Sequence, residues 1–388
     1  MTLRRIDFLL IVLVAVASFR VVLAFSSIEQ IPLVYAVAAP LPKAKPATPP
    51  VSEKPKVTHV ATPASVKAIY MTSWVGGTPS LRDKVLKVID DTEVNAIIID
   101  IKDYTGRIAF PVEDPKLAAV GSVERRIPNI RELIASLHAK NVYVIGRISS
   151  FQDAYLAQHR PDLAIHKLSD GGVWKDNKGV AWLDESNKEV WDYLVSIARD
   201  SYAQGFDELN FDYVRFPSDG NLKDFKFISY DPSVKTKAEQ MREFYQYLHD
   251  KLAGTGPAIS ADLFGLTSSS KDDLGIGQVL ENAAPYFDYI APMIYPSHYA
   301  SGFLNYKNPA DHPYEVMSSE MKIASERLVA ASSTPAKLRP WIQDFNLGAT
   351  YDAPMIRLEK KALTDTGISS WMIWSPSNKY TVGALDKE

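Results

Sequence analysis

The stretch KEVWDYLVSIARDSYAQGFDELNFDY, residues 188–213, contains the pattern from which the fold of this chain can be predicted. A helical pattern covers 188–204, and a short strand-like run follows it at 208–213. From Val66 to the end of the chain, runs rich in β-branched residues alternate with helical stretches in the same way. This alternation is typical of repeated βα units, whose strands lie parallel in one sheet.

Eight such strands are predicted, at 67–72, 95–101, 142–148, 208–213, 258–263, 289–294, 339–343 and 370–374. Seven helices are predicted between them, at 82–90, 130–139, 188–204, 235–252, 276–285, 315–330 and 355–363. Asp184 and Ser186 are candidate N-caps of the third helix. Eight strands favour a closed (β/α)₈ TIM barrel, and an open doubly wound sheet is the alternative. No Gly-rich phosphate loop follows a predicted strand, which argues against the nucleotide-binding form of the open sheet.

The first 38 residues have the composition of an export signal. Arg4 and Arg5 precede an apolar run at 8–19, which Arg20 interrupts. The uninterrupted run is shorter than the roughly 20 residues that a membrane span needs. Basic residues before a short apolar run are typical of a signal peptide, and the small residues 36–38 supply a cleavage site. The alternatives are an uncleaved signal anchor, with Arg20 reaching to the membrane surface, and a buried N-terminal helix.

Residues 39–65 are rich in proline, alanine and lysine and contain few large apolar side chains. Such a segment cannot bury enough surface to offset the entropy of ordering, so we predict a disordered, extended linker. The catalytic or binding domain would then occupy 66–388. We expect an exported protein, extracellular or held at the cell surface by its N-terminus.

Composition excludes several kinds of chemistry. The chain has no cysteine, which rules out disulfides, thiolate nucleophiles and cysteine-bound zinc. The formal net charge is -3 and no long basic run occurs, so we expect no nucleic-acid partner. We expect no cofactor, a monomer, and contact with a membrane only through the N-terminal segment.

In a barrel of this type the active site lies at the carboxyl ends of the strands. Acidic residues end the second, fourth, fifth and seventh predicted strands, namely Asp100, Asp212, Asp262 and Asp344. Carboxylates that lie close together repel one another, so the pKa of one of them rises and it keeps its proton. A protonated acid beside an ionised carboxylate is what glycoside hydrolysis requires. We therefore predict Asp212, Asp262 and Asp344 as catalytic residues.

Further side chains at the strand ends are suited to holding a sugar. Tryptophan and tyrosine rings match the apolar faces of sugar rings, and two arginines could keep Asp212 ionised. The predicted substrate-binding residues are Asp100, Arg147, Arg215, Tyr295, His298, Trp74 and Trp374. The competing interpretation of Asp212 is a structural ion pair with Arg147 or Arg215.

The segment GFDELNFDYVRFP at 205–217 resembles a family of glycoside hydrolases catalogued as a domain of unknown function with a (β/α)₈ barrel. The segments APMIYPSHY at 291–299 and WMIWS at 371–375 are similar to later strands of that family. The resemblance extends from about Val66 to the end of the chain and implies a sugar hydrolase. By analogy with amylase-type barrels, it implies that Asp212 is the nucleophile, Asp262 the acid and Asp344 an auxiliary carboxylate.

The same segment also resembles the chitinase motif Asp-x-x-Asp-x-Asp-x-Glu. Asp207 and Asp212 match its first and third acids, but Asn210 replaces the middle one and Val214 replaces the glutamate. Valine cannot donate a proton. Either the acid comes from another strand, or the protein binds sugars without cutting them.

Three hypotheses therefore remain open at this stage. The first is a glycosidase acting on an extracellular or cell-wall polysaccharide, with double-displacement retention as the preferred mechanism. The second is a non-catalytic glycan-binding barrel. The third is a divalent-metal hydrolase with Asp100, Asp212 and Asp262 as oxygen ligands. The scarcity of histidine at the strand ends argues against zinc.

Overall fold

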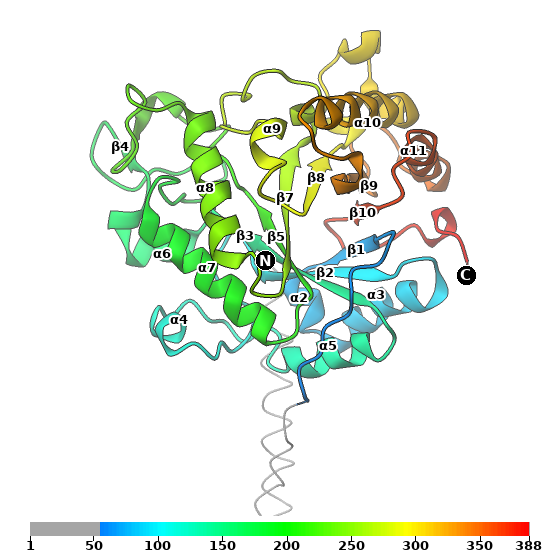
Figure 1. Cartoon of the computed structure of the whole chain (residues 1–388), viewed down its shortest axis with the longest axis horizontal. Coiled ribbons are helices and arrows are strands. Elements are labelled where there is room, and N and C mark those ends of the chain that lie inside the picture. Colours follow the sequence, from blue (N-terminus) through cyan, green and yellow to red (C-terminus); the bar gives the residue numbers. More distant parts are fainter. Residues whose placement is uncertain (1–54, 388) are drawn as a thin grey trace, which may run out of the picture. The chain divides into compact units, whose positions relative to one another are not determined.

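Eight parallel strands close into a barrel in the computed structural model, which describes residues 55–387 (Figure 1). They are β1 (Lys67–Met71), β2 (Ala96–Lys102), β3 (Tyr143–Ser149), β5 (Glu208–Asp212), β7 (Ala258–Phe264), β8 (Tyr289–Met293), β9 (Trp341–Gln343) and β10 (Trp371–Trp374). Each strand pairs with the next of these in chain order, and β10 pairs with β1 to close the ring. All eight predicted strands are confirmed.

The strands bury both of their faces. Every residue of β2 and β3 is buried, as expected for parallel strands covered by helices outside and by side chains inside. Inward-facing residues such as Tyr70, Ile98 and Tyr143 form a separate core within the ring. At Gly146 an added Cβ would lie 2.3 Å from the Cδ1 of Ile101, so the close packing there requires glycine.

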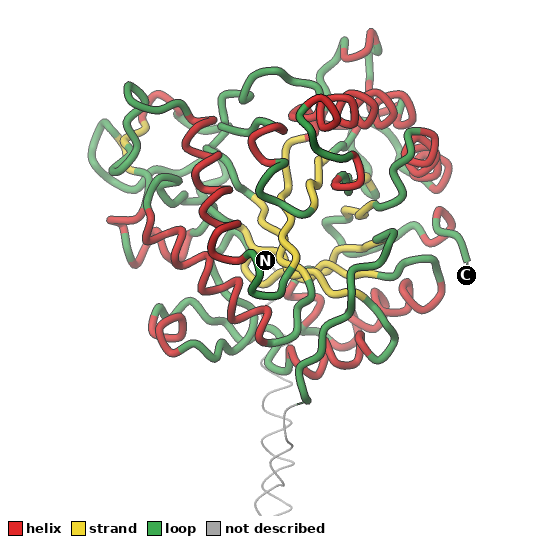
Figure 2. Tube along the Cα trace, viewed as in Figure 1, coloured by secondary structure: helices red, strands yellow, loops and turns green. Residues whose placement is uncertain are grey.

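Helices surround the strands in an outer layer, which Figure 2 shows in red around the yellow strands. They are α3 (Pro79–Asp91), α5 (Ile130–His138), α7 (Lys188–Ala203), α8 (Lys237–Leu252), α9 (Leu280–Ala283), α10 (Pro313–Ala330) and α11 (Ala353–Asp365). Shorter helices α2 (Ser73–Gly76), α4 (Pro115–Ala119) and α6 (Ala154–His159) lie in the connections. The predicted helices are present, most of them within about three residues of the expected ends.

Two local predictions about these helices were wrong. The helix expected at 276–285 is reduced to α9, because Gly275 and Gly277 adopt left-handed φ values of 70° and 85° just before it. The N-cap of α7 is Asn187, whose side chain accepts the N–H of Glu189. Asp184 instead accepts the backbone N–H groups of residues 228 and 229.

Two long connections at the carboxyl ends of the strands join each other through a small sheet that was not predicted. Strand β4 (His166–Lys167) follows β3, strand β6 (Phe225–Lys226) follows β5, and the two pair antiparallel. The insertion after β3 is thereby attached to the loop that follows β5. Both connections border the carboxyl end of β5.

The segment 55–65 lies against the barrel, although composition assigned it to a disordered linker (Figure 1, dark blue). The N–H of Val60 donates to Asp207 Oδ1 at 2.7 Å, and Thr62 Oγ1 lies 3.0 Å from the Tyr143 hydroxyl. His59 stacks on Tyr202 with ring centres 4.0 Å apart. These tertiary contacts order a segment that has no apolar pattern of its own, so the predicted linker extends too far at its carboxyl end.

The predicted signal peptide or anchor, and the linker up to residue 54, lie outside the described residues. Within 55–387, none of the helices combines the length and the apolar character that crossing a bilayer requires.

Candidate active site

Four charged side chains from four strands meet inside the carboxyl end of the barrel. The guanidinium of Arg147 on β3 is the centre of this cluster: its Nη1 donates to Asp100 Oδ1 at 2.8 Å and its Nε to Asp212 Oδ2 at 3.1 Å. The same Nε lies 4.0 Å from Asp262 Oδ2. Burial lowers the pKa of Arg147, but the charges of Asp212 and Asp100 raise it well above its ordinary value. One permanent cation therefore serves three carboxyl groups.

Asp212 is the last residue of β5, and donors surround its carboxyl group. Arg147 contacts Oδ2, and the N–H of Tyr213 donates to Oδ1 at 2.6 Å. Tyr213 makes this contact with a left-handed φ of 53°, a conformation that non-glycine residues rarely adopt. N–H donors on both oxygens stabilise the ionised carboxylate.

The turn at Tyr213 also directs Val214 away from the site. Its side chain is fully buried in the hydrophobic core, and its carbonyl accepts the hydroxyl of Tyr245 at 3.0 Å. Val214 cannot supply a proton. The structure thus agrees with the sequence that this position lacks the acid of the chitinase motif.

Asp262 on β7 lies deeper than Asp212 and has a different environment. Its Oδ1 accepts Asn210 Nδ2 at 3.0 Å and Trp341 Nε1 at 2.8 Å. Burial and the neighbouring charge of Asp212 raise the pKa of Asp262 to about 8, against the opposing effect of Arg147. At neutral pH Asp262 is therefore mainly protonated.

The separation of the two carboxyl groups follows from their shared neighbour. Oxygens of Asp212 and Asp262 lie 3.1 and 4.0 Å from the same Arg147 Nε. The two oxygens are then at most about 7 Å apart, so the two groups are no farther apart than the carboxyl pairs of glycosidases, which span up to about 9.5 Å. The predicted pair is thus brought together.

Asp100 and a group of aromatic rings lie next to the pair. Burial raises the pKa of Asp100, and Tyr70 donates its hydroxyl to Asp100 Oδ2 at 2.5 Å. The ring of Tyr70 stacks on Trp374 at 4.2 Å, and Trp341 packs edge-on against Trp374 at 5.6 Å. The rings fix the position of Tyr70, and Tyr70 in turn fixes Asp100, which is hydrogen-bonded to Arg147.

A pocket of about 480 Å³ opens beside Asp212. It is lined by residues from the ends of β5, β7 and β8 and from the insertion after β3, among them Asp212, Arg215, Phe264, Tyr295, His298 and Lys178. Asp262 does not line this pocket. Burial lowers the pKa of His298, which favours its neutral form.

Comparison with known proteins agrees with this geometry. The sequence profile of the DUF4015 family, described as "Putative glycosyl hydrolase domain", matches residues 68–380. The chain belongs to this family. Family membership makes the protein a glycosidase, and the closed barrel with its paired carboxyl groups is consistent with that class.

Solved structures similar to this glycosidase include a hypothetical protein from Ruminiclostridium thermocellum, which is 32% identical over 53% of this chain and 98% of that one, with a TM-score of 0.45. The glycoside hydrolase domain of PgaB (BpsB) from Bordetella bronchiseptica is 11% identical over 84% of this chain and 99% of that one, with a TM-score of 0.56. An α-galactosidase from Thermus thermophilus is 12% identical over 83% and 59%, with a TM-score of 0.48. At such identities the likeness to PgaB shows the fold alone. Among curated proteins, none matches this sequence.

Two of the residues predicted for the site of this glycosidase, Asp344 and Trp74, do not line the pocket. Both oxygens of Asp344 accept hydrogen bonds from Thr381, through its N–H and its hydroxyl at 2.8 Å each, and this fastens the C-terminal segment to the end of β9. Trp74 on α2 is 58% exposed and does not line the pocket, and Arg126 lies 4.4 Å from its ring centre.

The prediction that Arg215 could pair with Asp212 was also wrong, since Arg147 alone does so. Arg215 Nη1 donates to the carbonyl of Phe216 at 3.0 Å and to Ser218 Oγ at 3.3 Å. None of the ion pairs within 55–387 includes Arg215. Arg215 still lines the pocket, together with Tyr295 and His298, as the sequence led us to expect.

Sequence reasoning missed several residues that shape the site. Tyr70 is an inward-facing residue one position before the end of β1, and Trp341 is the first residue of β9. Asn210 is two residues before Asp212. The period of two along a strand places Asn210 and Asp212 on one face, which is the signal that could have identified Asn210. Lys178 reaches the pocket from the insertion after β3, and no local pattern predicts this.

The guanidinium of Arg147 occupies the centre of the carboxyl cluster, and this argues against the metal-hydrolase hypothesis. Asp100, Asp212 and Asp262 surround the guanidinium of Arg147, which occupies the position that a cation would need. Among residues 55–387, no group of three or more carboxylate, histidine or cysteine side chains is arranged to hold a metal ion.

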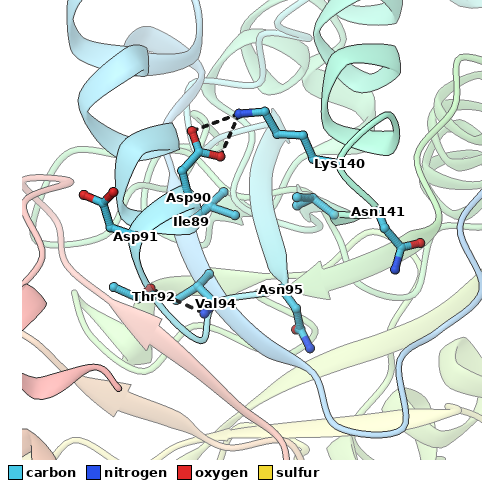
Figure 3. A pocket seen from close by; sticks show the side chains of 9 residues that line it. Ile89, Asp90, Asp91, Thr92, Val94, Asn95, Lys140 and Asn141 are labelled. Carbon is cyan, nitrogen blue, oxygen red and sulfur yellow. Dashed lines mark hydrogen bonds and ion pairs between the residues drawn. The ribbon is translucent and has the colours of Figure 1, made fainter. Parts of the chain in front are cut away.

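A second pocket, of about 510 Å³, lies at the opposite, amino-terminal ends of β2 and β3 (Figure 3). Its acids have partners: Lys140, just after α5, contacts both oxygens of Asp90 at 2.7 and 2.9 Å, and Asp91 pairs with Lys87 at 2.8 Å. Active sites of such barrels lie at the other face.

Proposed function

We propose that this glycosidase cleaves O-glycosidic bonds of an extracellular or cell-wall polysaccharide, with Asp212 as the ionised carboxylate and Asp262 as the proton donor. One observation carries the assignment: Arg147 contacts Asp212 directly, whereas Asp262 is 4.0 Å away and has a pKa of about 8. Asp262 thus carries a proton at neutral pH, as the general acid of a glycosidase must, and Arg147 is the cation that contacts Asp212. The export signal that we predict from the sequence of the first 38 residues supports a substrate outside the cytoplasm.

The chemical steps follow from these protonation states. Asp262 gives its proton to the oxygen that leaves, while a carboxylate oxygen of Asp212 bonds to the anomeric carbon as the glycosidic bond breaks. Asp262, now ionised, accepts a proton from the water that hydrolyses the glycosyl–Asp212 ester. Arg147 stabilises the carboxylate of Asp212 at the start and end of the cycle. This double displacement retains the configuration at the anomeric carbon.

The test is hydrolysis of a polysaccharide panel, measured as release of reducing ends. Asp212→Asn should lower turnover by more than about 1,000-fold, since the variant lacks the attacking carboxylate. Asp262→Asn should lower it comparably on substrates with poor leaving groups. The matched control is Asp90→Asn, which removes a carboxylate at the opposite end of the barrel and should retain full activity. Unchanged turnover in Asp212→Asn would disprove the assignment.

A non-catalytic glycan-binding barrel is the second candidate. It is favoured by the burial of Asp262, which is 1% exposed and lies outside the lining of the pocket, and by Val214 in place of an acid. In that case the wild-type protein would bind a glycan without releasing reducing ends, and Asp212→Asn would bind it equally well. Turnover by the wild type that is lost in Asp212→Asn excludes this candidate.

A further inference from the structure

Arg215 is a buried cation without a carboxylate partner, and it lies next to the reacting groups. The residue is 6% exposed and lines the pocket that contains Asp212. Its hydrogen bonds within the described chain go to the neutral acceptors Phe216 O and Ser218 Oγ, both through Nη1. The two remaining nitrogens of the guanidinium are left for a ligand.

The acids near Arg215 make no ion pair with its guanidinium within the described residues. Asp212 is engaged by Arg147, and Asp219 is exposed and accepts the N–H of Asn177 at 3.0 Å. The carboxyl group of Glu185 is buried, and burial together with the charge of Asp184 raises its pKa well above the usual range, which favours its neutral form. Burial lowers the pKa of Arg215, and the charges of Tyr213, Asp212, Asp219 and Glu185 oppose this effect.

Aromatic rings fix the position of the guanidinium. Its carbon lies 4.5 Å from the ring centre of Phe264, 5.0 Å from that of Trp182 and 5.2 Å from that of Tyr213. Rings at these distances attract a cation and limit its movement, but they do not replace an anion in a buried site. The guanidinium is therefore held ready for a partner from outside the chain.

The wall of the pocket adds a second cation. Lys178 lies on the exposed hairpin after β3 and lines the same pocket. The pocket is also lined by the carboxylates Asp212 and Asp219, and Arg215 and Lys178 are its cations. The planar guanidinium matches a carboxylate through two parallel hydrogen bonds. A neutral sugar ring would leave the two remaining guanidinium nitrogens without a charged acceptor.

We propose that this pocket binds an anionic substituent of the sugar next to Asp212, so that the substrate is an acidic polysaccharide, first of all one built from uronic acids. The inference rests on the proposed function, since it names the substrate class of the same site. A sulfate ester presents a similar oxyanion, and the experiment separates it from a carboxylate.

The experiment measures binding by calorimetry to the Asp212→Asn protein, which cannot consume its ligand. The probes are oligogalacturonate and oligoalginate (carboxylate), carrageenan oligosaccharides (sulfate), cello-oligosaccharides (neutral) and chitosan oligosaccharides (cationic), all of similar length. We expect the uronates to bind most tightly. Adding Arg215→Gln should weaken uronate binding by at least about 10-fold, because a charge-assisted pair is lost.

Two further variants control for folding and for non-specific charge effects. Lys178→Gln alters an exposed residue and should weaken uronate binding by about two- to fivefold, with a smaller dependence on salt. Lys175→Gln removes a cation from the same hairpin outside the pocket and should have no effect. If Arg215→Gln does not fold, Arg215→Lys and Lys178→Gln decide the question by the same measurement.

The outcomes separate this inference from the proposed function. Equal or tighter binding of neutral or cationic probes, or no binding of any acidic probe, overturns the inference. The inference is also overturned if the protein hydrolyses a neutral glycan and Arg215→Gln does not change the rate. That result would still support the assignment as a hydrolase. Binding of uronates that depends on Arg215 in a protein without turnover supports the inference and overturns the hydrolase assignment. Preference for the sulfated probe would keep the anionic site but replace the carboxylate as its ligand.

Discussion

Replacing Arg147 by methionine tests whether one guanidinium holds the carboxyl cluster together. The substitution keeps most of the side-chain volume but leaves Asp100 and Asp212, both buried, without the cation that each contacts. Removing one partner of a buried ion pair costs about 3–5 kcal/mol of folding free energy. With an unfolding entropy of about 2.1 cal/mol/K per residue over about 330 residues, this lowers Tm by about 4–7 °C.

The loss should depend on pH in a direction that follows from linkage. Arg147 is the cation that lowers the pKa of Asp100, which burial already raises, so this pKa rises further in the variant. A carboxyl group whose pKa is raised in the folded state binds more protons there, so its cost is present at high pH. The Tm difference between wild type and variant should therefore be larger at pH 8 and shrink as pH falls toward about 4, the unfolded value.

Calorimetry or dye-monitored melting from pH 4.5 to 8 measures the effect. Arg160→Met is the matched control, because Arg160 is 43% exposed and its pairs with Asp162 and Glu189 are worth less than about 1 kcal/mol. The double variant Arg147→Met/Asp212→Asn should recover about half of the loss, since one uncompensated charge is then absent. A Tm loss in Arg147→Met no larger than that of Arg160→Met, or one independent of pH, would refute the reasoning.

Three further predictions concern the acids and the bound N-terminal segment. Asp262→Asn should raise Tm relative to wild type, and by more at pH 8 than at pH 5. The neutral amide keeps an acceptor for Trp341 and removes a carboxyl group whose pKa is raised to about 8. A smaller gain in Tm at pH 8 than at pH 5 contradicts this. The hydrolytic rate of the wild type should fall as pH rises through about 8, where the proton donor ionises, and a pH profile that stays flat to pH 9.5 would argue against Asp262 as the acid. Asp207→Ala removes the acceptor of Val60 N–H, so trypsin should cut after Lys56 several-fold faster than in wild type, as followed by gel electrophoresis; an unchanged rate would mean that Asp207 does not hold the segment.

The barrel and the carboxylate pair could be predicted because both depend on local patterns. The runs 96–99 and 142–145 are apolar throughout, and a strand buried on both faces needs no knowledge of its neighbours to be recognised. Once eight parallel strands close, their carboxyl ends converge, so Asp212 and Asp262 had to approach each other. Asp344 lies one residue beyond β9, but this rule could not predict that its hydrogen-bond partner, Thr381, comes from the C-terminal segment.

Contacts between distant segments account for the other differences. The segment 55–65 has the composition of a linker, yet Asp207 and Tyr143 of the barrel supply its partners. Lys178 reaches the pocket through an insertion whose path depends on pairing between β4 and β6. Neither feature leaves a periodic signal, because the interacting residues are tens of positions apart in the chain.

The amino-acid sequence by itself determined the alternation of strands and helices and the acids at the strand ends, since side-chain periodicity is a local property of the backbone. Only the tertiary structure decided which arginine neutralises Asp212. The register of β3 against β5 brings Arg147 beside the acid, whereas the left-handed turn at Tyr213 carries Arg215 into an aromatic cage with no carboxylate partner. From the spacing along the chain, either Arg147 or Arg215 could pair with Asp212. The strand register and the turn at Tyr213 decide that Arg147 does so.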